Sequence, residues 1–132
     1  GEVELPETGA AIRARVVPRA EAPPAGPDTA ILDAALADGL TVRGWRPGDR
    51  FVPLGMTGHK KLQDFFTDEK VPAHARAAVA LVTHPASGII WVAGMRIAQT
   101  AKAPADAAEV LVLEMLRRSG DGRGNVSLDG EG

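Results

Sequence analysis

Alternating apolar and charged residues predict a β-hairpin at the start of the chain. Positions 12, 14 and 16 are apolar and alternate with Arg13 and Arg15, which is the two-residue period of a half-buried strand. A shorter apolar and acidic stretch over residues 2–5 precedes the turn-forming sequence Pro6-Glu7-Thr8-Gly9. We therefore expect antiparallel strands at 2–5 and 11–17, followed by a proline-rich loop over 19–28.

The next apolar segment fits two structures. Ile31 and Leu32 suit a short buried strand, whereas Ile31, Ala35 and Leu36 would share the inner face of a short helix. We favour a strand followed by one helical turn that ends at Gly39, with a further strand over residues 40–42.

Residues 60–68 have the apolar spacing of a helix. Leu62, Phe65 and Phe66 recur at i, i+3 and i+4 and so share one helix face. Pro72 fits the first turn of a second short helix that reaches Ala78, because proline is accepted where a helix begins.

The pattern of strands returns in the C-terminal half. Residues 79–83 and 89–92 are rich in β-branched side chains and flank a turn-forming insert at 84–88, which predicts a hairpin. Residues 110–113 are continuously apolar, so the last strand, over 110–116, is expected to be buried.

These elements together predict an α+β fold, with a small mixed β-sheet, hairpins and two or three short helices. We divide the chain into an N-terminal hairpin with its proline-rich connection (1–39), a core (40–117) and a tail (118–132). The tail is glycine-rich with scattered charge and has nothing to pack, so we expect it to be disordered.

Composition narrows the class of protein. A chain of 132 residues is long enough for one domain with a real core. The absence of cysteine excludes disulfides and thiolate metal sites and favours a cytoplasmic location. No apolar run approaches the roughly 20 residues of a membrane span, and the acidic start does not have the pattern of a signal peptide. We therefore expect a protein without membrane contact.

The charge is unevenly distributed along the chain. The net charge is −2, yet residues 43–61 hold five cations against the single anion Asp49. We call this segment the basic loop; its cations are Arg43, Arg46, Arg50, Lys60 and Lys61. His59 adds a partial charge near neutral pH. A local excess of four positive charges in an acidic protein indicates an anionic partner.

Glycine placement supports an anion-binding role for the basic loop. Pro47-Gly48 suits the two central positions of a tight turn that brings Arg46 and Arg50 near each other. Gly55 and Gly58 let the backbone approach a ligand and expose amide groups just before the helix expected at Lys60. Lysines are unfavourable at a helix N-terminus unless an anion joins them, and RNA phosphate is the anion we favour. The alternative is that these arginines only form surface ion pairs with Asp49, Asp64, Asp68 or Glu69.

The aromatic residues divide between core and interface. Phe65 and Phe66 could stack on bases, but their helical spacing with Leu62 favours packing, at least for Phe65. Trp91 lies in an apolar strand and is expected in the core, whereas Trp45 lies beside the arginines and is an interface candidate.

Catalytic motifs are absent. His59, His74 and His84 do not have metal-ligand spacing, and the chain contains no nucleophile elbow, Walker-type loop or convincing dinucleotide fingerprint. We expect no metal site and no catalytic residues, and therefore a binding module. Two alternatives stay open: a protein-interaction or dimerisation module that docks through the basic loop, and, with less support, a small hydrolase that uses His59 and Asp64.

Several ordered motifs resemble the C-terminal domain of bacterial tRNA(Ile)-lysidine synthetase. They are Arg46-Pro47-Gly48-Asp49-Arg50-Phe51, Pro53-Leu54-Gly55, Lys60-Lys61-Leu62-Gln63-Asp64-Phe65-Phe66, Lys70-Val71-Pro72 with Arg76, and Ile89-Ile90-Trp91-Val92-Ala93-Gly94-Met95-Arg96-Ile97. The similarity covers residues 40–99 well and the last strand loosely.

The resemblance implies an ATP-dependent ligase that attaches lysine to the wobble cytidine of an isoleucine tRNA with a CAU anticodon. It implies that ATP and lysine are used by a separate N-terminal domain, that this chain is a C-terminal piece without cofactors, and that it holds the tRNA at its acceptor stem. The RNA-binding residues that it implies, combined with those of the basic loop, are Arg43, Arg46, Gly48, Arg50, Gly55, Gly58, His59, Lys60, Lys61, Lys70 and Arg76.

Overall fold

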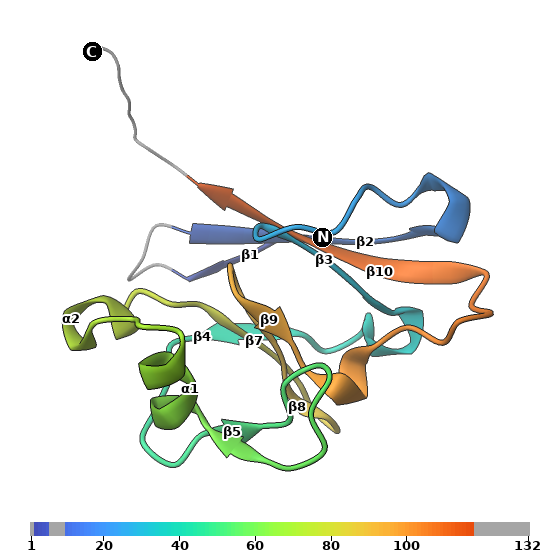
Figure 1. The fold of residues 1–132 in the computed structure, drawn as a ribbon. Helices are drawn as coiled ribbons and strands as arrows, with labels where there is room; N and C mark the ends of the chain where they lie inside the picture. The colour runs from blue at the N-terminus through green and yellow to red at the C-terminus, as the bar shows by residue number, and fades with distance from the viewer. Residues whose placement is uncertain (1, 6–9, 118–132) are drawn as a thin grey trace.

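The computed structural model describes residues 2–5 and 10–117, which form two four-stranded antiparallel sheets and a short two-stranded ribbon (Figure 1). The first sheet contains β1 (Glu2–Leu5), β2 (Ala10–Pro18), β3 (Thr29–Asp33) and β10 (Glu109–Arg117) in the order β1-β2-β10-β3. The last strand therefore lies between two strands from the start of the chain.

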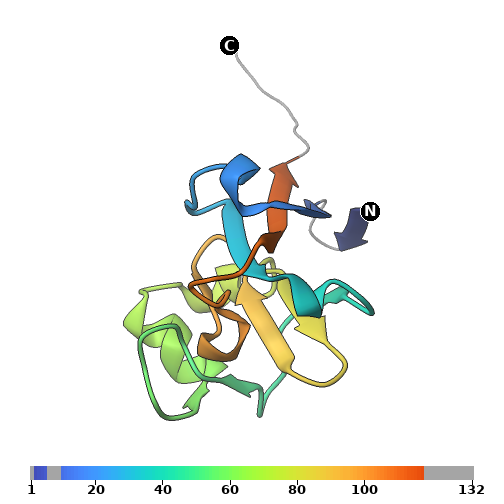
Figure 2. The same cartoon turned by 90° about the vertical axis from the view of Figure 1, so that its right-hand side faces the viewer.

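The second sheet holds the strands from the middle of the chain. It contains β4 (Thr41–Arg43), β7 (Leu81–His84), β8 (Gly88–Val92) and β9 (Arg96–Ile97) in that order. Figures 1 and 2 show the first sheet as one layer above the second. The separate ribbon pairs β5 (Arg50–Phe51) with β6 (Lys60–Lys61).

Short helices lie beside the second sheet and at the connections. Helix α1 (Leu62–Asp68) follows β6 directly, and α2 (Ala73–Arg76) comes soon after it; both lie beside β4 in Figure 1. Three 3₁₀ turns complete the described elements: η1 (Arg19–Glu21), η2 (Ala34–Leu36) and η3 (Gln99–Ala101).

One hydrophobic core joins the two layers and α1. Leu32 and Leu111 from the first sheet pack in the same buried cluster as Trp91 from the second sheet and Phe65 and Phe66 from α1. Leu111 and Leu113 of β10 belong to this cluster, and Val110 and Val112, which point to the opposite face of the strand, are buried as well. The helix face that carries Phe65 and Phe66 is thereby fixed, and the opposite face of α1 is left for solvent.

The α+β class expected from the sequence is confirmed. Both predicted hairpins are present, and the ambiguous segment forms β3 followed by the 3₁₀ turn η2, as favoured. Every described pairing is antiparallel, and the strands are divided over two sheets and a ribbon. Short hairpin connections join β1 to β2, β7 to β8 and β8 to β9, whereas β10 pairs with β2 and β3 over long sequence separations.

The predicted helix boundaries need correction. The first helix begins at Leu62 and not at Lys60, because both lysines pair with β5 as strand β6. The second helix covers Ala73–Arg76 only, and Pro72 is its N-cap. The turn expected at 6–9 and the tail expected at 118–132 lie outside the described residues. The proposed division at residue 39 stays a prediction; the first sheet combines strands from both sides of it.

Candidate nucleic-acid interface

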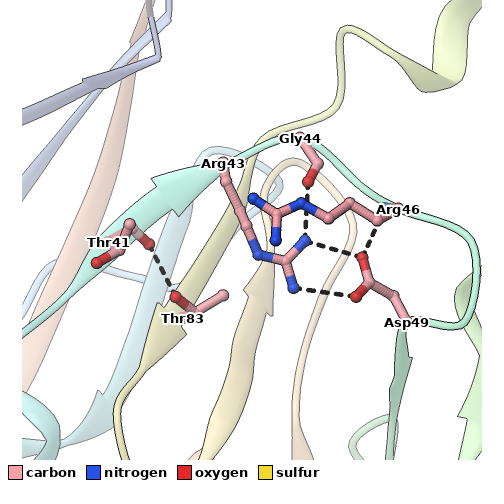
Figure 3. A network of polar contacts seen from close by, with 6 residues as sticks. All are labelled: Thr41, Arg43, Gly44, Arg46, Asp49 and Thr83. Atoms are coloured by element: carbon pink, nitrogen blue, oxygen red, sulfur yellow. Dashed lines mark hydrogen bonds and ion pairs between the residues drawn. The ribbon is translucent and has the colours of Figure 1, made fainter.

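The basic loop begins with a tight turn that is closed by Asp49. The Asp49 amide donates to the Arg46 carbonyl at 3.1 Å, and Gly48 has φ +92°, which is the geometry of a type II turn. One Asp49 carboxylate oxygen also accepts from the Arg46 amide at 2.7 Å (Figure 3). The turn predicted at Pro47-Gly48 is therefore confirmed, with a second closure that comes from the aspartate side chain.

Arg43 anchors the same carboxylate from strand β4. Its two terminal nitrogens donate to the two Asp49 oxygens at 2.9 and 3.0 Å, which is a bidentate fork (Figure 3). Hydrogen bonding to Asp49 raises the pKa of Arg43. Burial alone would raise the pKa of Asp49, but the hydrogen bonds from Arg43 and the Arg46 amide outweigh it and hold this pKa below its usual value. The charge of Arg43 is thus already balanced by Asp49. For this arginine the alternative of an ion pair with a nearby carboxylate is confirmed.

The turn is also connected to the start of α1. The Asp49 carbonyl accepts from the Leu62 amide, the first N–H of the helix, at 2.9 Å. That amide is therefore not available to an anion.

Arg50 and Lys61 are directly opposite each other in the β5–β6 ribbon. Opposed residues of an antiparallel pair extend to the same face, and like charges in that position destabilise the pair. The other opposed pair is Phe51 and Lys60; Phe51 is only 3% exposed, so the ribbon buries that face and leaves Arg50 and Lys61 in solvent. Within residues 2–5 and 10–117, neither Arg50 nor Lys61 has a side-chain hydrogen bond or ion pair.

An open pocket of about 440 Å³ lies beside this face of the ribbon. Its lining residues are Arg50, His59, Lys60, Lys61, Asp64, Thr67 and Asp68. Lys60 forms an ion pair with Asp68, so its charge is balanced in place. Arg50, Lys61 and the carboxylate of Asp64 line the pocket without a charged partner among the described residues.

The far end of α1 carries a lysine in a conformation that favours glycine. The Val71 amide donates to the Phe66 carbonyl at 2.8 Å and the Lys70 amide to the Thr67 carbonyl at 3.1 Å, which is a Schellman motif. Lys70 occupies its left-handed position with φ +61°, and it is the one non-glycine residue with positive φ in the described chain. Lys70 therefore lies at the end of α1 that is remote from the ribbon.

Two arginines hold α1 against the core. Arg76 lies 5.6 Å from the Phe66 ring centre and donates to the Val71 carbonyl at 3.0 Å. Arg96 lies 5.6 Å from the Phe65 ring centre and 3.6 Å from a Glu69 oxygen. These contacts give Arg76 a structural role. Arg96 was not among the predicted site residues, although it lies in the motif Gly94-Met95-Arg96 that contributed to the family resemblance.

The second glycine turn differs in part from expectation. Gly55 has φ +88° in a turn closed by a hydrogen bond from Met56 to the Pro53 carbonyl at 2.9 Å. The Gly55 amide donates to the Gln99 side chain at 2.7 Å, so it is not uncovered. This turn is instead fastened to η3, and it exposes Leu54 (38%) and Met56 (40%).

The aromatic residues serve the core. Phe65 and Phe66 are 2% and 0% exposed, so neither can stack on a base. Trp91 is buried as expected, and Trp45 is partly buried with its ring edge-on to Phe66 at 5.7 Å.

The structure brings together four of the predicted site residues, Arg50, His59, Lys60 and Lys61, around one pocket. Arg43, Arg46 and Gly48 belong to the neighbouring turn, Gly55 and Gly58 to the loop between the ribbon strands, and Lys70 and Arg76 to the opposite end of α1. Sequence reasoning treated Asp49 as a surface ion-pair partner, and Asp64 as such a partner or, with less support, as a hydrolase residue. The structure shows the first closing the turn and the second lining the pocket.

Other site types find no support in the described part of the chain. No group of three or more histidine, aspartate or glutamate side chains there could hold a metal ion. None of the helices within residues 2–5 and 10–117 has the length and apolar character needed to cross a membrane.

The fold is that of a small α+β domain whose β5–β6 ribbon exposes the cations Arg50 and Lys61. The model of the TilS substrate C-terminal domain family matches residues 40–114. The chain belongs to this family.

Curated relatives and a solved structure agree with this assignment. A tRNA(Ile)-lysidine synthase from Geobacter sulfurreducens is 43% identical over 77 residues, which cover 58% of this chain and 16% of the relative. A tRNA(Ile)-lysidine synthase from Symbiobacterium thermophilum is 40% identical over 97 residues, which cover 72% of this chain and 20% of the relative. A crystal structure of a TilS C-terminal domain superposes with a TM-score of 0.75 at 28% identity, covering 91% of this chain and 92% of that one. The chain therefore spans about a sixth to a fifth of the length of these relatives.

Proposed function

We propose that this domain binds tRNA, and that the face of the β5–β6 ribbon contacts the RNA backbone. The observation that carries the proposal is the opposition of Arg50 and Lys61 without a carboxylate partner among the described residues. Two like charges held opposite each other are unfavourable in the free protein, and a phosphate placed between them removes the repulsion.

The acceptor stem is the part of the tRNA that suits this face. Duplex RNA presents phosphates and 2′-hydroxyl groups along a wide, shallow minor groove, and proteins recognise it mainly by shape. The Phe65 and Phe66 rings are buried, so the domain does not offer these aromatic platforms to single-stranded bases. Arg46 is exposed at the first position of the turn that precedes the ribbon, and in our proposal its side chain adds a further phosphate contact.

In our proposal the catalytic reaction takes place in another part of the longer protein to which this domain belongs. The matched relatives are named tRNA(Ile)-lysidine synthase. In our proposal the parent enzyme is cytoplasmic and uses ATP to attach lysine to the wobble cytidine of an isoleucine tRNA with a CAU anticodon. ATP and lysine bind elsewhere in that enzyme, and this domain holds the tRNA body while the anticodon reaches the active site.

Binding of this chain to RNA tests the proposal directly. Fluorescence anisotropy would be measured with an isoleucine tRNA transcript and with an unrelated tRNA, over a series of salt concentrations. We expect binding that weakens steeply with salt, because phosphate contacts release counterions. Replacing Arg50 and Lys61 together with alanine should flatten the logarithmic salt slope by about one to two units.

A matched control removes the same residue types from elsewhere. Arg13→Ala with Lys102→Ala deletes one arginine and one lysine at exposed positions outside the ribbon pocket. This variant should keep the slope of the wild type to within about half a unit, since neither residue lines the pocket proposed to hold phosphate. Equal slopes for wild type and the Arg50/Lys61 variant would contradict the assignment of the ribbon.

One observation favours a second candidate, a protein-interaction module. Leu54 and Met56 are exposed apolar side chains on a turn that Gln99 holds rigid. Exposed apolar side chains on a rigid turn suit a protein contact. Absence of RNA binding at low salt, with self-association that Met56→Ser abolishes in sedimentation, would favour this candidate.

A further inference from the structure

The pocket beside the ribbon contains an acidic residue that a simple phosphate site does not explain. Asp64 lines the same pocket as Arg50 and Lys61, but its side chain forms no hydrogen bond or ion pair among residues 2–5 and 10–117. The other carboxylate of the pocket, Asp68, is already paired with Lys60. A carboxylate next to two phosphate-binding cations repels the phosphate, and this cost is offset only if the carboxylate makes a favourable contact with another group of the ligand.

We infer that Asp64 accepts a hydrogen bond from a ribose 2′-hydroxyl while Arg50 and Lys61 hold a neighbouring phosphate, so that this pocket distinguishes RNA from DNA. The inference rests on the proposed function, since it requires a nucleic acid on the ribbon. An ionised carboxylate only accepts hydrogen bonds, and the 2′-hydroxyl is the hydrogen-bond donor that RNA has and DNA lacks on its sugar-phosphate backbone.

The local structure places the three side chains on one short stretch of surface. Lys61 is the N-cap of α1 and Asp64 is in its first turn, three residues later. Residues three apart in a helix are neighbours on its surface. Arg50 is fixed opposite Lys61 by the ribbon. A ligand that reaches the two cations therefore also meets the carboxylate.

Position in the helix gives Asp64 only part of an explanation. An acidic side chain in the first turn interacts favourably with the helix dipole. The interaction with the helix dipole does not require two unpaired cations in the same pocket. It also predicts no difference in affinity between RNA and DNA, so an experiment can separate it from the proposed hydrogen bond to the 2′-hydroxyl.

The test compares three hairpin duplexes of one sequence: RNA, RNA with 2′-fluoro in place of every 2′-hydroxyl, and DNA. The 2′-fluoro duplex keeps the A-form shape but has no donor at the 2′ position, so it separates hydroxyl recognition from recognition of shape. For the wild-type chain at fixed salt, we expect RNA to bind about tenfold or more tightly than either other duplex. An acceptor left without its donor loses affinity of this order.

Asp64→Ala should bring the affinity ratio of RNA to 2′-fluoro RNA close to one. Removal of the negative charge should at the same time strengthen binding of the 2′-fluoro duplex, whereas RNA gains the same electrostatic benefit but loses the hydrogen bond to Asp64. The ratio is therefore the informative quantity, since general electrostatics affects both duplexes alike. Asp68→Ala is the matched control: it removes a paired carboxylate from the same pocket and should leave the ratio as in the wild type.

The outcomes separate this inference from the proposed function. Salt-sensitive binding with equal affinity for RNA and 2′-fluoro RNA, or an unchanged ratio in Asp64→Ala, would overturn the inference and leave RNA binding intact. No binding of any duplex at low salt would overturn the proposed function and this inference together.

Discussion

Arg43 and Asp49, on either side of the turn, form a bidentate ion pair that holds the basic loop in shape. The Arg43 side chain is 25% exposed and that of Asp49 is 13% exposed, so the pair is largely shielded from water. Asp49 also receives the Arg46 amide through its side chain and the Leu62 amide through its carbonyl. One residue therefore connects β4, the turn and the start of α1.

Asp49→Asn should lower the free energy of unfolding by about 1–3 kcal/mol at pH 7. The asparagine amide can accept only one of the two arginine hydrogen bonds, and Arg43 is left partly buried without a counter-charge. Urea unfolding measures the change. Asp38→Asn is the control, because Asp38 is exposed and has no hydrogen bond or ion pair among the described residues; its stability should stay within about 0.5 kcal/mol of the wild type. Equal losses in both variants would contradict the role of Asp49.

The same pair should make stability depend on pH in the acid range. The pKa of Asp49 is held below its usual value in the folded state. Its contribution is therefore complete above the unfolded pKa of about 4 and is lost as the pH falls through the folded pKa. The stability difference between wild type and Asp49→Asn should shrink as the pH is lowered below 4 and stay constant between about pH 5 and 8. A stability difference that grows on acidification would show that the pKa of Asp49 is not lowered in the folded state.

Lys70→Gly should raise the free energy of unfolding by about 0.5–1 kcal/mol. Lys70 has φ +61° at the left-handed position of the Schellman motif, where glycine avoids the clash of a Cβ atom. Chemical denaturation of Lys70→Gly and Lys70→Ala separates strain from charge, since alanine removes the charge and keeps the strain. Equal stability of the two variants would mean that the backbone at this position is not strained.

Three glycine-to-alanine variants should rank by backbone strain and space. Gly39 has φ +80° and a Cβ there would lie 2.8 Å from Pro85, so Gly39→Ala should cost up to about 3 kcal/mol. Gly48 has φ +92° with open space around it, so Gly48→Ala should cost about 1–2 kcal/mol from strain alone. Gly26 has neither feature, and Gly26→Ala should be neutral or stabilising by up to about 1 kcal/mol. Melting temperatures of the three variants give the order directly.

Arg96 should contribute more through Phe65 than through Glu69. The ion pair is 3.6 Å long and both side chains are 39% exposed, so Glu69→Gln should cost less than about 0.5 kcal/mol. Arg96→Ala should cost about 0.5–1 kcal/mol because it also loses the contact with the ring. A double-mutant cycle on Arg96 and Glu69 measures the pair alone. A coupling energy above about 1 kcal/mol between Arg96 and Glu69 would show that the ion pair contributes more than the contact with Phe65.

The local elements could be read from the sequence because their causes are local. The alternation at 12–16, the apolar spacing of Leu62, Phe65 and Phe66, and the Pro47-Gly48 turn all depend on residues close together in the chain. The helix start was misplaced by two residues, since Lys60 and Lys61 pair with residues 50 and 51 at a distance that periodicity does not report.

The sequence by itself determined that this chain is an α+β domain with a buried last strand and a cationic glycine loop, because apolar period and turn chemistry are properties of neighbouring residues. Only the tertiary structure decided which cations stay available. The register of the ribbon places Arg50 opposite Lys61, whereas Arg43 and Lys60 are balanced by Asp49 and Asp68. Charge pairing depends on distances between side chains of different elements, and the fold alone sets those distances.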